Sequence, residues 1–368
     1  MKIGIITYHF CQNYGAVLQC YALQKYIQSI GLDCYVLDAI SSKQKKNNSL
    51  YSGKQGMMRI IRNAVLLPLH FQRKEKKKKF EKFVGEQMNL SSYCSNCNEL
   101  RDLIMNNKFD VIIAGSDQVW NPANNDFDEM FFFPFECKAK KIGYAISLGS
   151  ATKEDLVSYK DYIGLFDTVT AREESACPIL TDFTRKTVEQ VVDPALLIGK
   201  DHWLKLAQHS TYPIKGKYVV CYLLNKAHYN DYYTFSKRIA DNLGAKLISI
   251  ETSYGFHSFR KNTLIDLGPY DFLSIIKNAS FICTDSFHGT VFASVFNVPF
   301  CSLIAVEKEK DTRVKDYLYS VGLKDRMVLS NELSLDHLHF EKSDGSKVER
   351  TINELTIKSK IVLKSLLR

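Results

Sequence analysis

The sequence predicts an α/β protein built from two doubly wound, Rossmann-like domains. The chain has 368 residues, which is more than one compact domain usually holds. Short apolar runs, rich in β-branched and aromatic residues, alternate with segments of helical periodicity. This alternation is typical of parallel sheets covered by helices. A second series of such runs begins near residue 212, which indicates a second domain.

The first domain is predicted to cover residues 1–205. Its strands are expected at the apolar runs 2–7, 33–38, 110–114, 141–147, 168–171 and 188–192. The helix expected at 15–30 has apolar residues at every fourth position on one face, and Gly31 ends it. The loop between the first strand and this helix carries no G-x-G-x-x-G, so the dinucleotide fingerprint is absent.

The second domain is predicted to cover residues 206–345. Its strands are expected at 217–224, 246–250, 280–283 and 299–304, and its helices at 229–243, 270–278, 289–296 and 311–321. Residues 346–368 have apolar side chains near helical spacing and are predicted to form a long C-terminal helix. This helix could pack back across the junction between the two domains.

A basic segment of about residues 40–85 interrupts the first domain and carries much of the net charge of +9. Residues 57–83 combine an apolar face with a lysine run, and Pro68 is expected to kink or split them. Such a segment can make a peripheral contact with a membrane through residues 57–82, but packing on its own domain is the favoured interpretation. No zinc-finger, helix-turn-helix or RNP pattern accompanies the charge, so nucleic acid is not an expected partner.

The composition argues against several classes of protein. No uncharged apolar run approaches the roughly 20 residues that span a bilayer, and the first residues lack the features of a signal peptide. Several of the ten cysteines lie inside apolar runs, which is typical of a reducing compartment, so a cytoplasmic location is expected. Cys94 and Cys97 form a lone C-x-x-C, which does not suffice for a zinc ribbon.

The stretch of residues 279–308 carries the clearest signal for a functional site. It has the pattern of a strand, a turn, a helix and a strand, whose right-handed crossover brings both carboxyl ends to one ligand-binding rim. His288 falls at the N-terminus of the helix, and Lys308 follows the second strand. An imidazole, an ammonium group and helix N–H groups together suit an anion site with an acid or base. The alternative is that His288 only caps the helix and Lys308 is a solvated lysine.

Two further polar residues follow predicted strands of the first domain. Asp117 lies in the segment GSDQVW after the strand at 110–114, where a carboxylate can be a general base, a ligand of sugar hydroxyls or a helix cap. Arg172 follows the strand at 168–171, and its two-pronged donor set can hold a carboxylate or a phosphate. An ion pair with a neighbouring glutamate is the alternative for Arg172.

Several short segments, in this order along the chain, resemble the polysaccharide pyruvyl transferase family. They are NYGA at 13–16, YALQ at 21–24, GSDQVW at 115–120, AREES at 171–175, DPA at 193–195 and SFHG at 286–289, with Pro299 and Lys308. The resemblance extends over most of the chain. It implies a GT-B-like arrangement of the two Rossmann-like domains, with the site in the cleft between them.

The resemblance also implies a transferase reaction. A pyruvyl group would pass from phosphoenolpyruvate, as co-substrate, to a hydroxyl pair of a cell-surface glycan or its precursor, which gives a pyruvate ketal. A lipid-linked acceptor at the inner membrane face would suit residues 57–82. No residue set resembles a metal site, so neither a metal nor a further cofactor is expected.

The family's motifs also imply which residues act. His288 and Asp117 become the candidate catalytic residues, and the imidazole suits proton transfer because it ordinarily titrates near neutrality. The other candidates are assigned to the donor (Arg172, Lys308, Ser286 and Gly289) and to the acceptor (Asn13, Tyr14, Gly15 and Trp120).

The chain departs from the family pattern at one position. Ser286 stands where many members have an arginine, and a serine cannot supply a guanidinium group. The missing cation could come from Lys310, Arg313 or Arg260. Two other functions fit the same scaffold: a glycosyltransferase that uses a nucleotide sugar, and a glycan-binding protein without catalysis.

Overall fold

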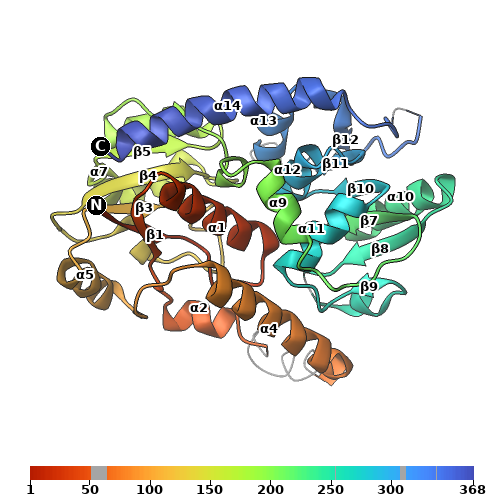
Figure 1. The fold of residues 1–368 in the computed structure, drawn as a ribbon, viewed down its shortest axis with the longest axis horizontal. Helices are drawn as coiled ribbons and strands as arrows, with labels where there is room; N and C mark the ends of the chain where they lie inside the picture. The colour runs from red at the N-terminus through yellow and green to blue at the C-terminus, as the bar shows by residue number, and fades with distance from the viewer. Residues whose placement is uncertain (51–63, 253, 307–311, 337) are drawn as a thin grey trace.

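The computed structural model describes residues 1–50, 64–252, 254–306, 312–336 and 338–368. In these residues, two six-stranded parallel sheets are flanked by helices, which confirms the predicted fold class (Figure 1). The strand order is β2-β1-β3-β4-β5-β6 in the first sheet and β12-β11-β10-β7-β8-β9 in the second. The strands are β1 (Lys2–Ile6), β2 (Asp33–Val36), β3 (Val111–Ala114), β4 (Lys140–Ile146), β5 (Thr168–Ala171), β6 (Glu189–Gln190), β7 (Tyr218–Tyr222), β8 (Lys246–Ile250), β9 (Thr263–Leu264), β10 (Phe281–Thr284), β11 (Phe300–Ile304) and β12 (Met327–Leu329).

Helices connect these strands and cover both faces of each sheet (Figure 1). They are α1 (Tyr14–Ser29), α2 (Ser42–Asn47), α4 (His70–Gln87), α5 (Cys97–Asn106), α6 (Lys153–Leu156), α7 (Lys160–Gly164), α8 (Ala176–Thr184), α9 (Lys200–Ala207), α10 (Tyr229–Asn242), α11 (Pro269–Asn278), α12 (Phe287–Val295), α13 (Arg313–Ser320) and α14 (Gly345–Leu366). Among the described helices, none has the length and the apolar character that crossing a membrane requires.

The central strands are buried on both faces, as parallel strands between two helix layers should be. All four residues of β3 and all four of β10 are buried. In the first sheet Ile3 of β1 pairs with Val111, and in the second sheet Cys283 of β10 pairs with Cys221. Continuous apolar runs of this kind have no polar face, so they specify central strands.

The loops at the carboxyl ends of strands in both sheets meet at one cavity. Residues after β1 and β3 line it from the first sheet, and residues after β7 and β8 line it from the second. This is the rim at which open α/β sheets bind ligands. The two sheets therefore present their ligand-binding edges to each other.

The basic segment also contributes to the contact between the two halves. Helix α4, from the first half of the chain, packs on α11 of the second. Its Phe80 and Phe83 are buried in the same cluster as Phe272, and Lys79 forms an ion pair of 3.0 Å with Asp271. Residues 64–82 thus contact the second half of the chain. Residues 57–63 lie outside the described residues.

The long C-terminal helix is confirmed as α14, and it runs along both halves of the molecule (Figure 1). Its first turns bury Val348 and Ile352 in the cluster that contains the second sheet's residues, and its end buries Leu363 among residues of the first sheet. The amide of Val192 donates to the Ser359 hydroxyl at 2.9 Å. The predicted domain boundary at 205/206 falls inside α9 and stays a prediction.

Candidate active site

The cavity between the two sheets has a volume of about 500 Å³ and is lined by both halves of the chain and by the basic segment. The loop after β1 contributes Tyr8 and Asn13, and the turn after β3 contributes Asp117. Tyr254 reaches the cavity from the second sheet, and Lys76 reaches it from α4. The site thus needs both halves of the chain and the basic segment.

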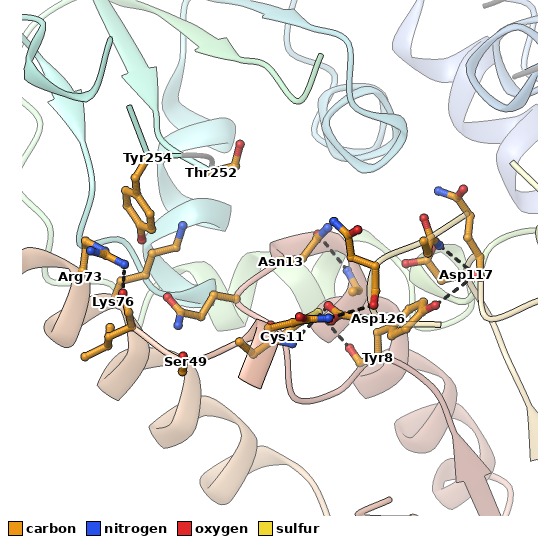
Figure 2. Close-up of a pocket in the computed structure, with 18 of the residues that line it drawn as sticks. Tyr8, Cys11, Asn13, Ser49, Arg73, Lys76, Asp117, Asp126, Thr252 and Tyr254 are labelled. Carbon is orange, nitrogen blue, oxygen red and sulfur yellow. Dashed lines mark hydrogen bonds between the residues drawn. The ribbon is translucent and has the colours of Figure 1, made fainter. Parts of the chain in front are cut away.

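Charge is distributed unevenly along this cavity. Arg73 and Lys76 lie beside Tyr254 at one end, and Asp117 and Asp126 lie at the other (Figure 2). Asn13 lies between the two ends, where neutral polar side chains line the wall. The cavity therefore offers an anion-binding end and an end suited to hydroxyl groups.

Asp117 occupies the acidic end and has an unusual backbone conformation. Its φ is 77°, in the left-handed region that non-glycine residues rarely adopt. Its carbonyl accepts from the amide of Ser147 at 3.2 Å, and the Tyr8 hydroxyl donates to the carbonyl of Gln118 at 3.3 Å. Strained backbone held by its neighbours is common at functional sites. The carboxylate is mostly buried and faces both the cavity and Arg172.

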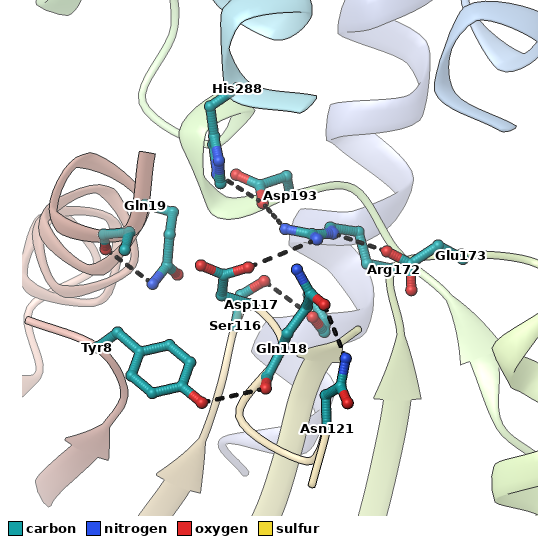
Figure 3. Close-up of polar contacts among 12 residues, drawn as sticks. Tyr8, Gln19, Ser116, Asp117, Gln118, Asn121, Arg172, Glu173, Asp193 and His288 are labelled. Carbon is teal, nitrogen blue, oxygen red and sulfur yellow. Dashed lines mark hydrogen bonds and ion pairs between the residues drawn. The ribbon is translucent and has the colours of Figure 1, made fainter. Parts of the chain in front are cut away.

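Arg172 lies behind Asp117 and is surrounded by three carboxylates (Figure 3). Its Nε donates to Glu173 at 3.0 Å, its Nη1 donates to Asp193 at 2.8 Å, and its Nη2 lies 3.7 Å from Asp117. Burial opposes the charge, but Glu173, Asp193 and Asp117 together raise the pKa of Arg172 above its ordinary value. The guanidinium also lies over the Phe287 ring, 4.2 Å from its centre. Arg172 is thus largely occupied by the protein's own acids.

His288 joins the same network from the second half of the chain. It lies in the first turn of α12, and its Nε2 is 3.4 Å from Oδ2 of Asp193 (Figure 3). Burial alone would raise the pKa of Asp193, but His288, Arg172 and the amide of Ala195 hold it well below its usual range. The structure therefore brings His288 and Arg172 together, through the carboxylate that lies between them.

Gly15 allows this approach of the two halves. A Cβ at position 15 would lie 2.1 Å from Nδ1 of His288, which is closer than any real contact. The first turn of α1 therefore packs directly against the imidazole. The role of Gly15 in the structure is to let two helices from different halves come into contact at His288.

The other acceptor candidates occupy different places. Asn13 is exposed, lines the cavity and accepts from the amide of Ala16 as the N-cap of α1. Tyr14 is fully buried, stacks on Phe272 with 4.6 Å between ring centres, and donates its hydroxyl to Leu267. Trp120 is also fully buried and donates its indole N–H to Phe131 at 3.1 Å. Both rings are thus packed in the core with internal partners, and their assignment to the acceptor stays a prediction.

The remaining donor candidates are partly structural. Ser286 is the N-cap of α12, and its hydroxyl accepts from the amide of Gly289 at 3.3 Å. A Cβ at Gly289 would lie 2.4 Å from Oγ1 of Thr284, so only glycine fits there. Lys308 and Lys310 lie outside the described residues.

Two arginines were candidates to replace the family's missing cation. Arg313 lines a small pocket beside Arg172 and Glu173. Arg260 donates to Asn230 and lies over the Tyr233 ring, so it is engaged within the second half.

The sequence reasoning missed Arg73 and Lys76 as site residues. It expected residues 57–82 to pack on their own domain, with peripheral membrane contact as the alternative, and assigned no residue of this segment to the site. Arg73, Lys76, Phe80 and Phe83 nevertheless follow one another at steps of three or four residues, and all four are buried. The apolar stripe of Phe80 and Phe83 thus continues into Arg73 and Lys76, and this pattern could have indicated two buried cations. Among the described residues, no group of three His, Cys, Asp or Glu side chains is arranged to hold a metal ion.

Comparisons with known proteins agree with this architecture. A family model described as polysaccharide pyruvyl transferase matches residues 13–305. None of the curated proteins compared with the chain matches it.

Solved structures with a similar fold extend over nearly the whole chain. UDP-GlcNAc 2-epimerase from Methanocaldococcus jannaschii has a TM-score of 0.52 and 14% identity, and the match covers 97% of this chain and 100% of that one. S. aureus MnaA, in a co-structure with UDP, has a TM-score of 0.55 and 15% identity, with 97% of each chain covered. UDP-N-acetylglucosamine 2-epimerase from Rickettsia bellii has a TM-score of 0.51 and 11% identity, with 100% of this chain and 96% of that one covered. At these identities the similarity shows the fold alone, which is GT-B-like.

Proposed function

The chain belongs to the polysaccharide pyruvyl transferase family and is a transferase, and we propose that it moves a pyruvyl group from phosphoenolpyruvate to a sugar hydroxyl pair. The product is a pyruvate ketal on a glycan or its precursor. The observation that carries this proposal is the cavity between the two sheets, with cations at one end and Asp117 at the other. A small acid with two anionic groups suits the first end, and a saccharide suits the second.

The reaction balances with groups of the two substrates alone. The two acceptor oxygens form bonds to C2 of phosphoenolpyruvate, and the bond from C2 to the phosphate oxygen breaks. One of the two hydroxyl protons balances the proton that C3 gains when it becomes a methyl group. The second hydroxyl proton leaves with inorganic phosphate. The protein must therefore accept two hydroxyl protons, deliver one to C3 and one to the departing phosphate, and hold that phosphate.

Asp117 and His288 divide this proton transfer in our proposal. Asp117 faces the cavity, so its carboxylate is the base that orients and deprotonates an acceptor hydroxyl. His288 delivers the proton to C3, and Asp193, 3.4 Å from its Nε2, orients the imidazole. Both roles require small movements when substrates bind, because His288 contacts Asp193 and Gly15 in this structure.

The remaining site residues have binding roles in this proposal. Arg172 contributes its Nη2 edge, which lies 3.7 Å from Asp117, to the donor, while Lys308 supplies a second cation. Ser286 and Gly289 fix the first turn of α12, whose N–H groups face the donor's anion. Asn13, exposed in the cavity wall, hydrogen-bonds to the acceptor.

The acceptor side offers room for a lipid carrier. A second cavity of about 520 Å³ shares Gln12 and Ser49 with the first. It is lined by apolar side chains, among them Phe10, Phe80 and Val84. We propose a cytoplasmic enzyme whose saccharide acceptor is lipid-linked, with peripheral membrane contact near Phe71, which is 79% exposed. Equal sedimentation of the wild type and Phe71→Ser with anionic vesicles would contradict the membrane contact.

The test of the reaction is phosphate release from phosphoenolpyruvate in the presence of a saccharide panel. We expect acceptor-dependent release that falls by at least about 100-fold in His288→Ala and Asp117→Asn. Release at the wild-type rate in His288→Ala would refute the acid role. The surface variant Asp182→Asn is the control, because Asp182 is exposed and forms a surface ion pair with Lys153.

Binding separates this proposal from its main alternative. S. aureus MnaA, which has a similar fold, was determined with UDP, so nucleotide sugars belong in the same assay. We expect phosphoenolpyruvate to raise the melting temperature and UDP sugars to leave it unchanged. The opposite result would favour a glycosyltransferase, and no shift with either ligand would favour a glycan-binding protein.

A further inference from the structure

Lys76 is a buried cation that faces the cavity from α4. Its side chain is almost completely buried, and its Nζ donates to the carbonyl of Glu251 at 2.8 Å. The ring centres of Tyr14 and Tyr254 lie 4.9 and 5.8 Å from this nitrogen. An ammonium group has three donor hydrogens. The described residues provide one hydrogen-bond acceptor for Nζ, and the group also lines the cavity.

Arg73 lies one turn earlier on the same face of α4. It is 6% exposed, donates to the carbonyl of Leu50, and lies 4.7 Å from the centre of the Tyr254 ring. Lys226, in the loop after β7, lines the same cavity. Figure 2 shows Arg73, Lys76 and Tyr254 gathered at the end opposite Asp117. Two buried cations therefore lie on one helix face, and no carboxylate of the described residues accepts a hydrogen bond from Lys76.

A structural role alone does not explain Lys76. The carboxylate of Glu251 accepts from the Ser258 hydroxyl at 2.7 Å and from the Thr252 amide at 2.9 Å. It also lies 3.3 Å from Nε2 of His257. Burial lowers the pKa of Lys76 to about 8, with Glu251 opposing the shift, so the charged form is disfavoured there. A methionine would fill the same space without this cost, which indicates that the charge serves a ligand.

We propose that Lys76 and Arg73 form a phosphate-binding site at the end of the cavity formed by α4 and the second sheet. A phosphate group carries close to two negative charges at neutral pH and three strong acceptor oxygens. An ammonium and a guanidinium, three residues apart on one helix face, match both properties. The phosphate is that of phosphoenolpyruvate or the diphosphate of a saccharide carrier. In the first case the inference rests on the proposed function and deepens it, because it assigns the donor's phosphate to this end of the cavity.

Calorimetry on the full chain with three probes tests this site. The probes are inorganic pyrophosphate, phosphoenolpyruvate and pyruvate, which has the carboxylate but no phosphate. We expect Lys76→Met to weaken at least one phosphate probe by about ten- to a hundredfold, the loss typical of a hydrogen bond to a charged group. Pyruvate binding should not change. Lys78→Met is the matched control, because Lys78 lies on the same helix and is exposed.

The outcomes separate the two phosphate sources and the two proposals. Loss for phosphoenolpyruvate assigns the site to the donor, and loss for pyrophosphate alone assigns it to a diphosphate carrier. Arg73→Met should weaken the same phosphate probes as Lys76→Met. If Lys76→Met does not fold, Arg73→Met alone tests the site. Wild-type affinities in both variants, or no phosphate probe bound by the wild type, would overturn the site. A pyrophosphate effect without pyruvyl transfer would uphold the site and refute only the reaction.

Discussion

At the residue scale, Lys76 should reduce the stability of the fold that it serves. Its pKa falls from 10.5 to about 8 because burial disfavours the charged form. Between these two values the unfolded chain binds more protons than the folded chain, so stability rises with pH through this window. Below pH 8 the ammonium is charged in both states, and the fold then carries the whole cost of about 3 kcal/mol.

Lys76→Met should therefore stabilise the protein at pH 7. We expect a gain of about 1–3 kcal/mol in the free energy of unfolding, because the lost hydrogen bond to Glu251 takes back about 1 kcal/mol. Urea denaturation at pH 7 and above pH 10.5 measures the effect, and the gain should disappear at the higher pH. Lys78→Met should have no such effect. A Lys76→Met protein that is less stable than the wild type at pH 7 would contradict the argument.

Asp193 should have the opposite effect on stability. Its carboxylate contacts Arg172 at 2.8 Å and His288 at 3.4 Å, and its pKa in the folded protein is lowered. Its contribution is therefore present above the ordinary pKa of an aspartate and is lost as the pH falls toward the folded value. Asp193→Asn should cost about 3–5 kcal/mol at pH 7, because it removes the carboxylate that lies between Arg172 and His288 and leaves the buried guanidinium less compensated. Denaturation of Asp182→Asn, a surface pair, should change little by comparison.

At the element scale, much of the fold could be predicted because its central elements have one-sided or continuous apolar patterns. The strand at 110–114 is apolar throughout, and the structure has β3 at Val111–Ala114. The edge strands of the second sheet, β9 and β12, were not predicted in this way. β9 has only two residues, Thr263 and Leu264, both half-buried, and its pairing with β8 defines it. Edge pairing depends on a neighbour's hydrogen bonds, which no local pattern records.

The site was predictable where the chemistry lies at strand ends, and less so where it depends on contacts across the chain. His288 and Arg172 were expected at one site, and both contact Asp193. The position of the Asp193 carboxylate between them depends on the path of the chain after β6, which no local pattern shows. Lys76 was missed for a similar reason, because α4 packs against helices of both halves, α1 and α11.

Gly15→Ala tests the contact between α1 and α12. The added Cβ would meet Nδ1 of His288 at 2.1 Å, so the imidazole or one helix must move. We expect a loss of about 1–3 kcal/mol in stability, typical of overpacking, together with a clear loss of activity. Gly164→Ala, in α7, is the control, because nothing lies within 4 Å of its new Cβ. Unchanged stability and activity in Gly15→Ala would show that the two helices do not hold His288 in this way.

At the scale of the whole molecule, the two halves share one core. The cluster that contains Tyr14 and Phe80 from the first half also contains Tyr222 and Phe272 from the second. Helix α14 adds a second connection. Its beginning is buried in the shared cluster, and its end is buried in a cluster of the first half. Halves that share buried apolar surface should unfold together, because neither keeps its core when the other opens.

The two tryptophans provide a probe in each region. Trp120 lies in a cluster of the first half, and Trp203 lies in the cluster that both halves share. We expect tryptophan fluorescence and far-UV circular dichroism to give coincident unfolding curves in the wild type, in Trp120→Phe and in Trp203→Phe. Separate transitions in any of these would show that the halves unfold independently.

Leu363→Ala should shift the unfolding transitions recorded by Trp120 and by Trp203 to the same extent. Leu363 is fully buried at the end of α14 against the first sheet, so its truncation should cost about 2–5 kcal/mol. Ile361 is 63% exposed on the same helix, and Ile361→Ala should leave the curves nearly unchanged. If α14 connects the halves, the loss at Leu363 will appear equally in the signal of Trp203, which lies in the shared cluster. A shift confined to the Trp120 signal would mean that α14 stabilises the first half alone.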